Sequence, residues 1–98
     1  MKINVHASWE VNDYFHKLIQ ENLEKLQTFY EGIIYADVYL KNSDGEGIKD
    51  KTVEIKLGVP GPDLFAHESE DTLEKALAAT TENLRRQLKK MKEKSKPY

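Results

Sequence analysis

Apolar residues in this chain switch three times between the two-residue period of a strand and the three-to-four-residue period of a helix. This order constrains the fold strongly, because each segment offers one apolar face that must be covered. The strand-like segments are residues 2–7, 33–41, 51–58 and 63–69, and the helix-like segments are 11–29 and 73–91. We therefore predict an α+β fold, a β-α-β-β-β-α two-layer sandwich whose four-stranded sheet carries both helices on one face.

The first helix is predicted to begin at Asn12, a good N-cap residue, with Asp13 in its first turn and Gly32 at its end. Its predicted buried stripe is Val11, Tyr14, Phe15, Leu18, Ile19, Asn22, Leu26 and Phe29. The second helix is predicted to begin with the capping pair Asp71 and Glu74. Its predicted stripe is Leu73, Ala76, Leu77, Thr80, Leu84, Leu88 and Met91.

Strand alternation divides the predicted sheet into a covered face and an open face. The covered positions are Ile34, Ala36, Val38, Leu40, Val53, Ile55 and Leu57. The open positions are Tyr35, Asp37, Tyr39, Lys41, Thr52, Glu54 and Lys56. Turns are expected at 42–47 and at Pro60-Gly61-Pro62. One core should bury Val5, Leu18, Leu26, Val38, Ile55, Leu77, Leu84 and Leu88.

A length of 98 residues fits one domain, which we place at residues 1–94, followed by a short C-terminal tail at 95–98. Cysteine is absent, which fits a reducing cytoplasm and excludes disulfides and thiolate metal sites. No signal peptide is evident, and no apolar run approaches the ~20 residues that span a bilayer. We expect a cytoplasmic protein with no membrane contact.

Charge is distributed very unevenly along the chain. Residues 85–98 hold seven basic residues and one acid, a net +6, whereas residues 1–84 hold eight lysines and sixteen acids, a net −8. At helical spacing, the basic side chains form one stripe and a second, shorter one. The first contains Arg85, Lys89, Lys92 and Lys96, and the second contains Arg86 and Lys90. The longer stripe spans about 16 Å at 1.5 Å per residue, and a rigid row of cations suits a phosphate backbone.

Two plainer interpretations of the charges and aromatics stay open. Cations near a helix C-terminus complement its dipole, and a lysine-rich tail also keeps a protein in solution. Tyr35 and Tyr39 on the open face could stack on single-stranded bases, but Asp37 lies between them and tyrosine is an ordinary strand residue.

His6, His16 and His67 lack metal-ligand spacing. We expect no catalytic residues, no metal, no cofactor and no small-molecule substrate, and therefore no enzyme.

Several segments together resemble the ribosome hibernation-promoting factors, also called ribosome-associated inhibitors or sigma-54 modulation proteins. Lys25-Leu26-x-x-Phe29-Tyr30 looks like the family's Lys-Leu-x-x-aromatic element, and residues 33–38 and 51–55 resemble its second and third strands. The segment from Asp71 through Lys92 is the most specific match. Its matching residues are Asp71, Ala76, Leu77, Leu84-Arg85-Arg86-Gln87-Leu88, Lys90 and Lys92.

The resemblance implies a fold similar to double-stranded RNA-binding domains and a translation inhibitor that binds ribosomal RNA of the small subunit in the messenger and transfer RNA channel. It assigns RNA contact to Arg85, Arg86, Lys89, Lys90 and Lys92, with Lys25 as a further candidate. Leu73 replaces a frequent aromatic. Long family members continue into a dimerisation domain, and we expect this chain to be a short form without it. The alternatives are a generic structured-RNA-binding module and a protein-interaction module.

Overall fold

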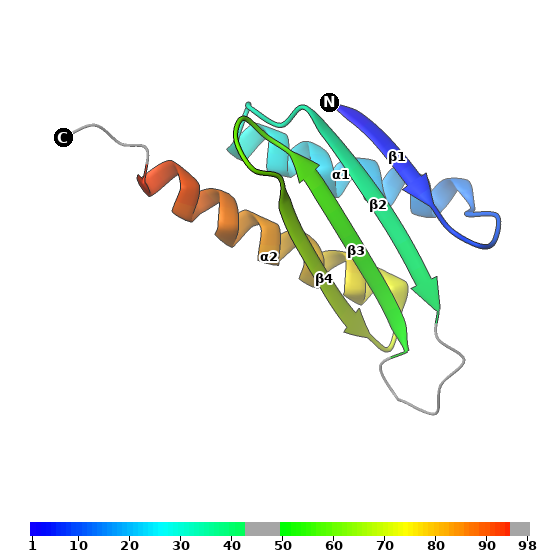
Figure 1. Ribbon diagram of the computed structural model, residues 1–98. Helices are drawn as coiled ribbons and strands as arrows, with labels where there is room; N and C mark the ends of the chain where they lie inside the picture. Colours follow the sequence, from blue (N-terminus) through cyan, green and yellow to red (C-terminus); the bar gives the residue numbers. More distant parts are fainter. Residues whose placement is uncertain (43–49, 95–98) are drawn as a thin grey trace.

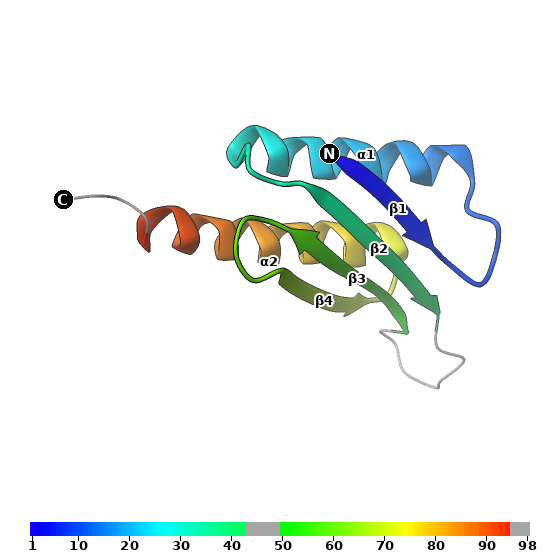
Figure 2. The same ribbon diagram turned by 45° about the horizontal axis from the view of Figure 1, so that its top comes forward.

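The structure, a computed structural model, describes residues 1–42 and 50–94. Its elements are β1 (Lys2–His6), α1 (Asp13–Phe29), β2 (Tyr35–Asn42), β3 (Lys51–Gly58), β4 (Leu64–Glu70) and α2 (Leu73–Lys94). The strands form one sheet in the order β1-β2-β3-β4, with β1 parallel to β2 and the other pairs antiparallel. Both helices cover the same sheet face (Figures 1 and 2), so the predicted fold class is confirmed. The predicted tail at 95–98 and most of the loop at 42–47 lie outside the described residues.

The core lies between the two layers and is built from the alternation that the sequence contains. Val38 of β2 pairs with Ile55 of β3, and both side chains are fully buried. The helices contribute Leu26, Leu84 and Leu88 among others. Two of the eight predicted core residues, Val5 and Leu18, are only partly buried and pack against the edge of the cluster. β1 is an edge strand, so its side chains are covered from fewer directions than those of β2 and β3.

Three side chains on the predicted buried surfaces lie elsewhere. Tyr14 is 66% exposed, whereas Phe15 beside it is the residue of the first turn of α1 that is buried in the core. Asn22 is half-buried, and its Nδ2 donates to the Leu18 carbonyl at 2.8 Å. Leu23, four residues after Ile19, takes the buried position that the prediction gave to Asn22. Ile34 is 61% exposed because β2 begins only at Tyr35, so the predicted alternation starts one residue too early.

The helix boundaries confirm one predicted cap and correct two. The Phe15 N–H donates to Asn12 Oδ1 at 2.8 Å, as predicted. α1 ends at Phe29 rather than at Gly32, because Tyr30 turns to an extended conformation while its N–H still donates to the Leu26 carbonyl at 2.8 Å. At α2 the N-cap is Thr72, whose Oγ1 accepts from the Lys75 N–H at 3.1 Å. The predicted cap, Asp71, instead forms an ion pair with Lys75 at 3.1 Å.

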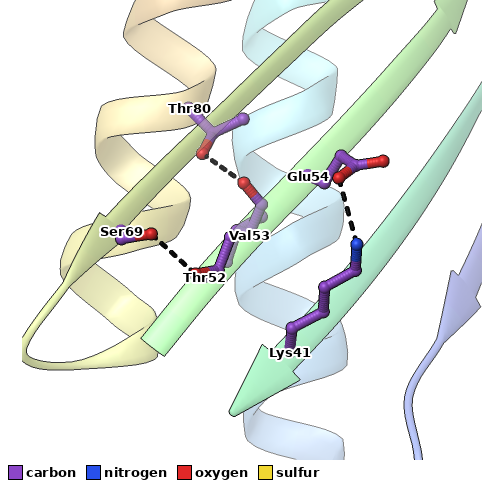
Figure 3. Close-up of polar contacts among 6 residues, drawn as sticks. All are labelled: Lys41, Thr52, Val53, Glu54, Ser69 and Thr80. Atoms are coloured by element: carbon purple, nitrogen blue, oxygen red, sulfur yellow. Dashed lines mark hydrogen bonds and ion pairs between the residues drawn. The ribbon is translucent and has the colours of Figure 1, made fainter. Parts of the chain in front are cut away.

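A buried hydroxyl fastens α2 to the sheet. Thr80 has no exposed surface, and its Oγ1 lies 2.9 Å from the Val53 carbonyl of β3 (Figure 3). The same oxygen lies 2.7 Å from the Ala76 carbonyl of its own helix. A buried hydroxyl without a partner would destabilise the fold, whereas this one bridges the layers. On the open face, Thr52 and Ser69 are joined across β3 and β4 at 2.6 Å. The position of α2 over the sheet is therefore fixed by polar as well as apolar contacts.

Candidate nucleic-acid interface

The second half of α2 presents the basic side chains found in the sequence. The helix has 22 residues, a length of about 33 Å at 1.5 Å per residue. Its buried residues extend from Ala76 to Leu88, and its last turns run past the ends of the strands (Figures 1 and 2). Six basic residues of this half are described, and all six are exposed. Five of them were predicted to contact RNA, and we call these five the cationic segment: Arg85, Arg86, Lys89, Lys90 and Lys92. The sixth, Lys94, is the last residue of the helix.

Arg85 already has an anionic partner on its own helix. Its Nε lies 3.0 Å from one carboxylate oxygen of Glu82 and its Nη2 lies 2.7 Å from the other, a bidentate pair. The hydrogen bond from Arg85 lowers the pKa of Glu82, and the same contact raises the pKa of Arg85. A phosphate that approaches Arg85 must therefore displace a carboxylate, so this arginine is a weaker phosphate ligand than its exposure suggests.

Lys92 joins the ends of the two helices. Its Nζ donates to the Phe29 carbonyl at 2.9 Å and lies 4.5 Å from the centroid of the Phe29 ring. α1 has no basic residue in its own last turn. Lys92 therefore supplies the cation that complements the negative end of the α1 dipole. This contact gives Lys92 a structural role that the helical spacing alone did not indicate.

Arg86, Lys89 and Lys90 remain as the available cations of the segment. Within residues 1–42 and 50–94, none of the three has a hydrogen bond or ion pair, and all three are exposed. They surround a shallow hollow on α2 that Asn83, Gln87 and Glu93 also line. The geometry therefore leaves three exposed cationic side chains of the segment on the solvent side of the helix.

Two amides on the flank of α2 hold this region against β4. Gln87 Nε2 donates to the Phe65 carbonyl at 2.8 Å and to Asn83 Oδ1 at 2.9 Å. Asn83 Nδ2 in turn donates to Glu68 at 2.8 Å. The sequence prediction did not include Asn83 in the site. Its spacing of four residues from Gln87 on a helix was a signal that the two side chains could form a hydrogen bond. The chain of amides fixes the rotation of α2 and hence the direction of the cations.

Lys25 lies on the other helix at the same end of the molecule. It is exposed, has no hydrogen bond or ion pair within the described part of the chain, and lies one turn before Phe29, the residue that Lys92 contacts. The fold therefore brings Lys25 and the cationic segment to neighbouring helix ends, as a shared site would need.

The aromatic residues of the open sheet face do not belong to this surface. Tyr39 stacks on His6 of β1 with ring centroids 4.6 Å apart. The Tyr35 hydroxyl donates to Asp63 at 2.9 Å, and its ring covers Gly58, where an added Cβ would lie 2.0 Å from a ring carbon. The hydrogen bond to Asp63 raises the pKa of Tyr35. Both tyrosines thus have partners in the sheet and lie opposite the helix layer.

The described part of the chain holds neither a metal-binding cluster nor a membrane-spanning helix. No group of three or more histidine, aspartate or glutamate side chains there has the geometry to hold a metal ion. No helix in residues 1–42 and 50–94 has the length and apolar content that crossing a bilayer requires.

Fold and surface together define a class of small α+β domain that offers a cationic helix end. The model of the family described as sigma 54 modulation protein / S30EA ribosomal protein matches residues 3–96, and the chain belongs to this family. No curated protein matches the sequence.

Solved structures share the fold at low sequence identity. A ribosomal subunit interface protein from Coxiella burnetii superimposes with a TM-score of 0.83 at 20% identity, covering 94% of this chain and 98% of that one. The N-terminal domain of Protein Y from Thermus thermophilus gives 0.76 at 22% identity, covering 92% and 94%. The two neighbours therefore bear out the two-layer architecture with both helices on one face.

Proposed function

We propose that this protein is a ribosome-associated translation inhibitor, a hibernation factor that binds ribosomal RNA of the small subunit in the messenger and transfer RNA channel. Its family includes a ribosomal protein by description, and one structural neighbour is a ribosomal subunit interface protein. Both are consistent with a ribosomal partner. In the cell, the protein would act in the cytoplasm.

The observation that carries the proposal is the set of three available cations within the cationic segment of α2. Arg86, Lys89 and Lys90 are exposed and have no hydrogen bond or ion pair within the described residues. A phosphate that they contact displaces counterions without first breaking a described hydrogen bond or ion pair. Arg86 can also take a phosphate in bidentate fashion, which lysine cannot. Lys25 at the end of α1 would extend the contact to a second helix.

Lys92 and Arg85 would contribute differently. Lys92 holds the two helix ends together through Phe29, so its first effect would be on the spacing between Lys25 and the α2 cations. Arg85 would contact RNA only by exchanging Glu82 for a phosphate. We therefore expect Arg86, Lys89 and Lys90 to supply most of the binding free energy of the segment.

Co-sedimentation with purified small ribosomal subunits tests the proposal. The protein should pellet with the subunits at moderate salt, and added transfer RNA should release it, because both would occupy the same channel. Release by transfer RNA separates this function from generic binding to structured RNA, which should persist. Failure to pellet at any salt concentration would contradict the proposal and favour the protein-interaction module.

A further inference from the structure

Both helices begin at one end of the molecule, away from the cationic segment (Figure 1). A groove lies at this end, lined by residues at the start of α1 and of α2 and by Leu40 of β2. Its floor is apolar, because it is lined by Phe15 and Leu40, which are buried, and by Leu73, which is half-buried. Two large aromatic side chains form its exposed part, with Trp9 at 37% and Tyr14 at 66% exposure. An apolar floor beside exposed aromatic side chains forms a contiguous patch, which is typical of a binding surface. Single apolar residues scattered over a surface are ordinary and indicate no binding site.

The charge of the groove is negative. Glu10 and Glu74 line it, and none of its lining residues is basic. The positive ends of α1 and α2 do not offset these carboxylates fully, since a helix start carries only about half a positive charge. One first-turn N–H of each helix is already bound, by Asn12 in α1 and by Thr72 in α2. The groove therefore repels phosphates and attracts cations.

We propose that this groove docks a protein segment in which an apolar side chain lies next to lysine or arginine. The apolar side chain would cover Leu40 and Leu73 and be removed from water. The neighbouring cation would reach Glu10 or Glu74 and lie over the ring of Trp9 or Tyr14, since aromatic faces attract lysine and arginine. A nucleic acid lacks the cation, and an anionic membrane surface would be repelled. The inference does not depend on ribosome binding.

Trp9 makes the test direct, because it is the single tryptophan of the chain and lines the groove. The full chain is titrated with the blocked hexapeptide Lys-Lys-Leu-Leu-Lys-Lys while Trp9 fluorescence is recorded. Two comparison peptides replace all lysines with glutamate or both leucines with serine. We expect a saturable change in emission with the first peptide and none with the glutamate peptide. The serine peptide should bind at least about tenfold more weakly, because two buried leucines are lost.

A matched pair of variants tests the site. Glu10→Gln with Glu74→Gln removes the two groove carboxylates, and Glu24→Gln with Glu31→Gln removes the same charge from exposed positions near the other end of α1. The first pair should weaken the peptide about three- to tenfold, and the second should leave it nearly unchanged. Tyr14→Ala, at an exposed position, should weaken it as well while the melting temperature is kept.

Four outcomes would overturn the proposal. The Trp9 emission could fail to respond up to millimolar peptide, the glutamate peptide could bind as well as the lysine peptide, or both glutamine pairs could weaken binding equally. A fourth is self-association: if sedimentation equilibrium gives a dimer that Glu10→Gln with Glu74→Gln dissociates, and the peptide does not bind, a second copy occupies the groove instead.

Discussion

Replacing Lys89 and Lys90 together with alanine should flatten the salt dependence of ribosome binding without unfolding the protein. Each cation–phosphate contact contributes roughly 0.7 to 0.9 to the log–log slope, so two contacts contribute about 1.4 to 1.8. We expect this whole change in slope, because neither ammonium group has a described hydrogen bond or ion pair that a phosphate would have to replace. Both side chains are exposed, so the free energy of unfolding should change by ~0.5 kcal/mol or less.

Arg85→Ala provides the internal comparison. Its guanidinium is held by Glu82 at 2.7 and 3.0 Å, so a phosphate contact there also breaks an ion pair. The slope should then fall by less than one full contact, below about 0.7. If all cations of the segment were equivalent, as spacing alone predicts, Arg85→Ala would change the salt slope as much as Lys89→Ala does.

Sedimentation binding to small subunits over a salt series, together with thermal melting, measures both quantities. The control is Lys41→Ala with Lys75→Ala, which removes the same charge from exposed lysines paired with Glu54 and Asp71. These lysines lie near the other end of the molecule. Their distance from the cationic segment exceeds the screening length of ~8–10 Å at physiological salt, so they should not affect phosphate contacts there. If the Lys89/Lys90 variant and the parent gave superimposable curves, the end of α2 would be a solvated tail and the proposed mode of binding would be wrong.

Four other changes have defined outcomes. Leu84→Ala should lower the free energy of unfolding by about 2–5 kcal/mol in urea titrations, since Leu84 is fully buried; a loss under ~1 kcal/mol would contradict its place in the core. Thr80→Val should cost about 0.5–1.5 kcal/mol by removing the hydrogen bond to Val53, and an unchanged stability would deny that bond a net role. Tyr39→Ala should keep subunit affinity within tenfold, because Tyr39 lies on the sheet face opposite the helices. Glu82→Gln should raise that affinity by releasing Arg85, whereas a decrease would refute the competition. The pKa of Glu82 is lowered in the folded state, so its ion pair with Arg85 stabilises the protein at pH values above the ordinary glutamate pKa. This stabilisation is lost as the pH falls through the lowered pKa, and the carboxyl chemical shift of Glu82 measures that titration.

The fold was accessible from the sequence because periodicity records which face of each element is buried. Val38 and Ile55 alternate in strands, and Leu77, Leu84 and Leu88 repeat along a helix, so both the elements and their covered faces could be predicted. Boundaries were less accessible. The cap at Thr72 and the early end of α1 depend on local backbone conformation, which neighbouring residues of similar type, such as Asp71, do not distinguish.

The candidate site was predictable as a set of residues but not as a set of unequal roles. Arg85 and Glu82 are three residues apart, so the sequence already contained the signal for their pairing. The contact of Lys92 with Phe29 joins residues 63 positions apart, and no local pattern reveals it. Trp9 also escaped prediction, since the groove that it lines forms only when two helix starts and the end of β2 meet.

The arrangement of charge along α2 has a kinetic consequence. The helix begins with Glu74 at the acidic groove and ends in the cationic segment, so its side chains form a dipole opposed to that of the peptide groups. The peptide dipole amounts to only about half a charge at each end, which the side chains exceed. In the field of a polyanion, the whole molecule would rotate so that the cationic end arrives first. Such steering raises the fraction of productive encounters. Added salt should therefore lower the association rate more than it shortens the lifetime of the complex.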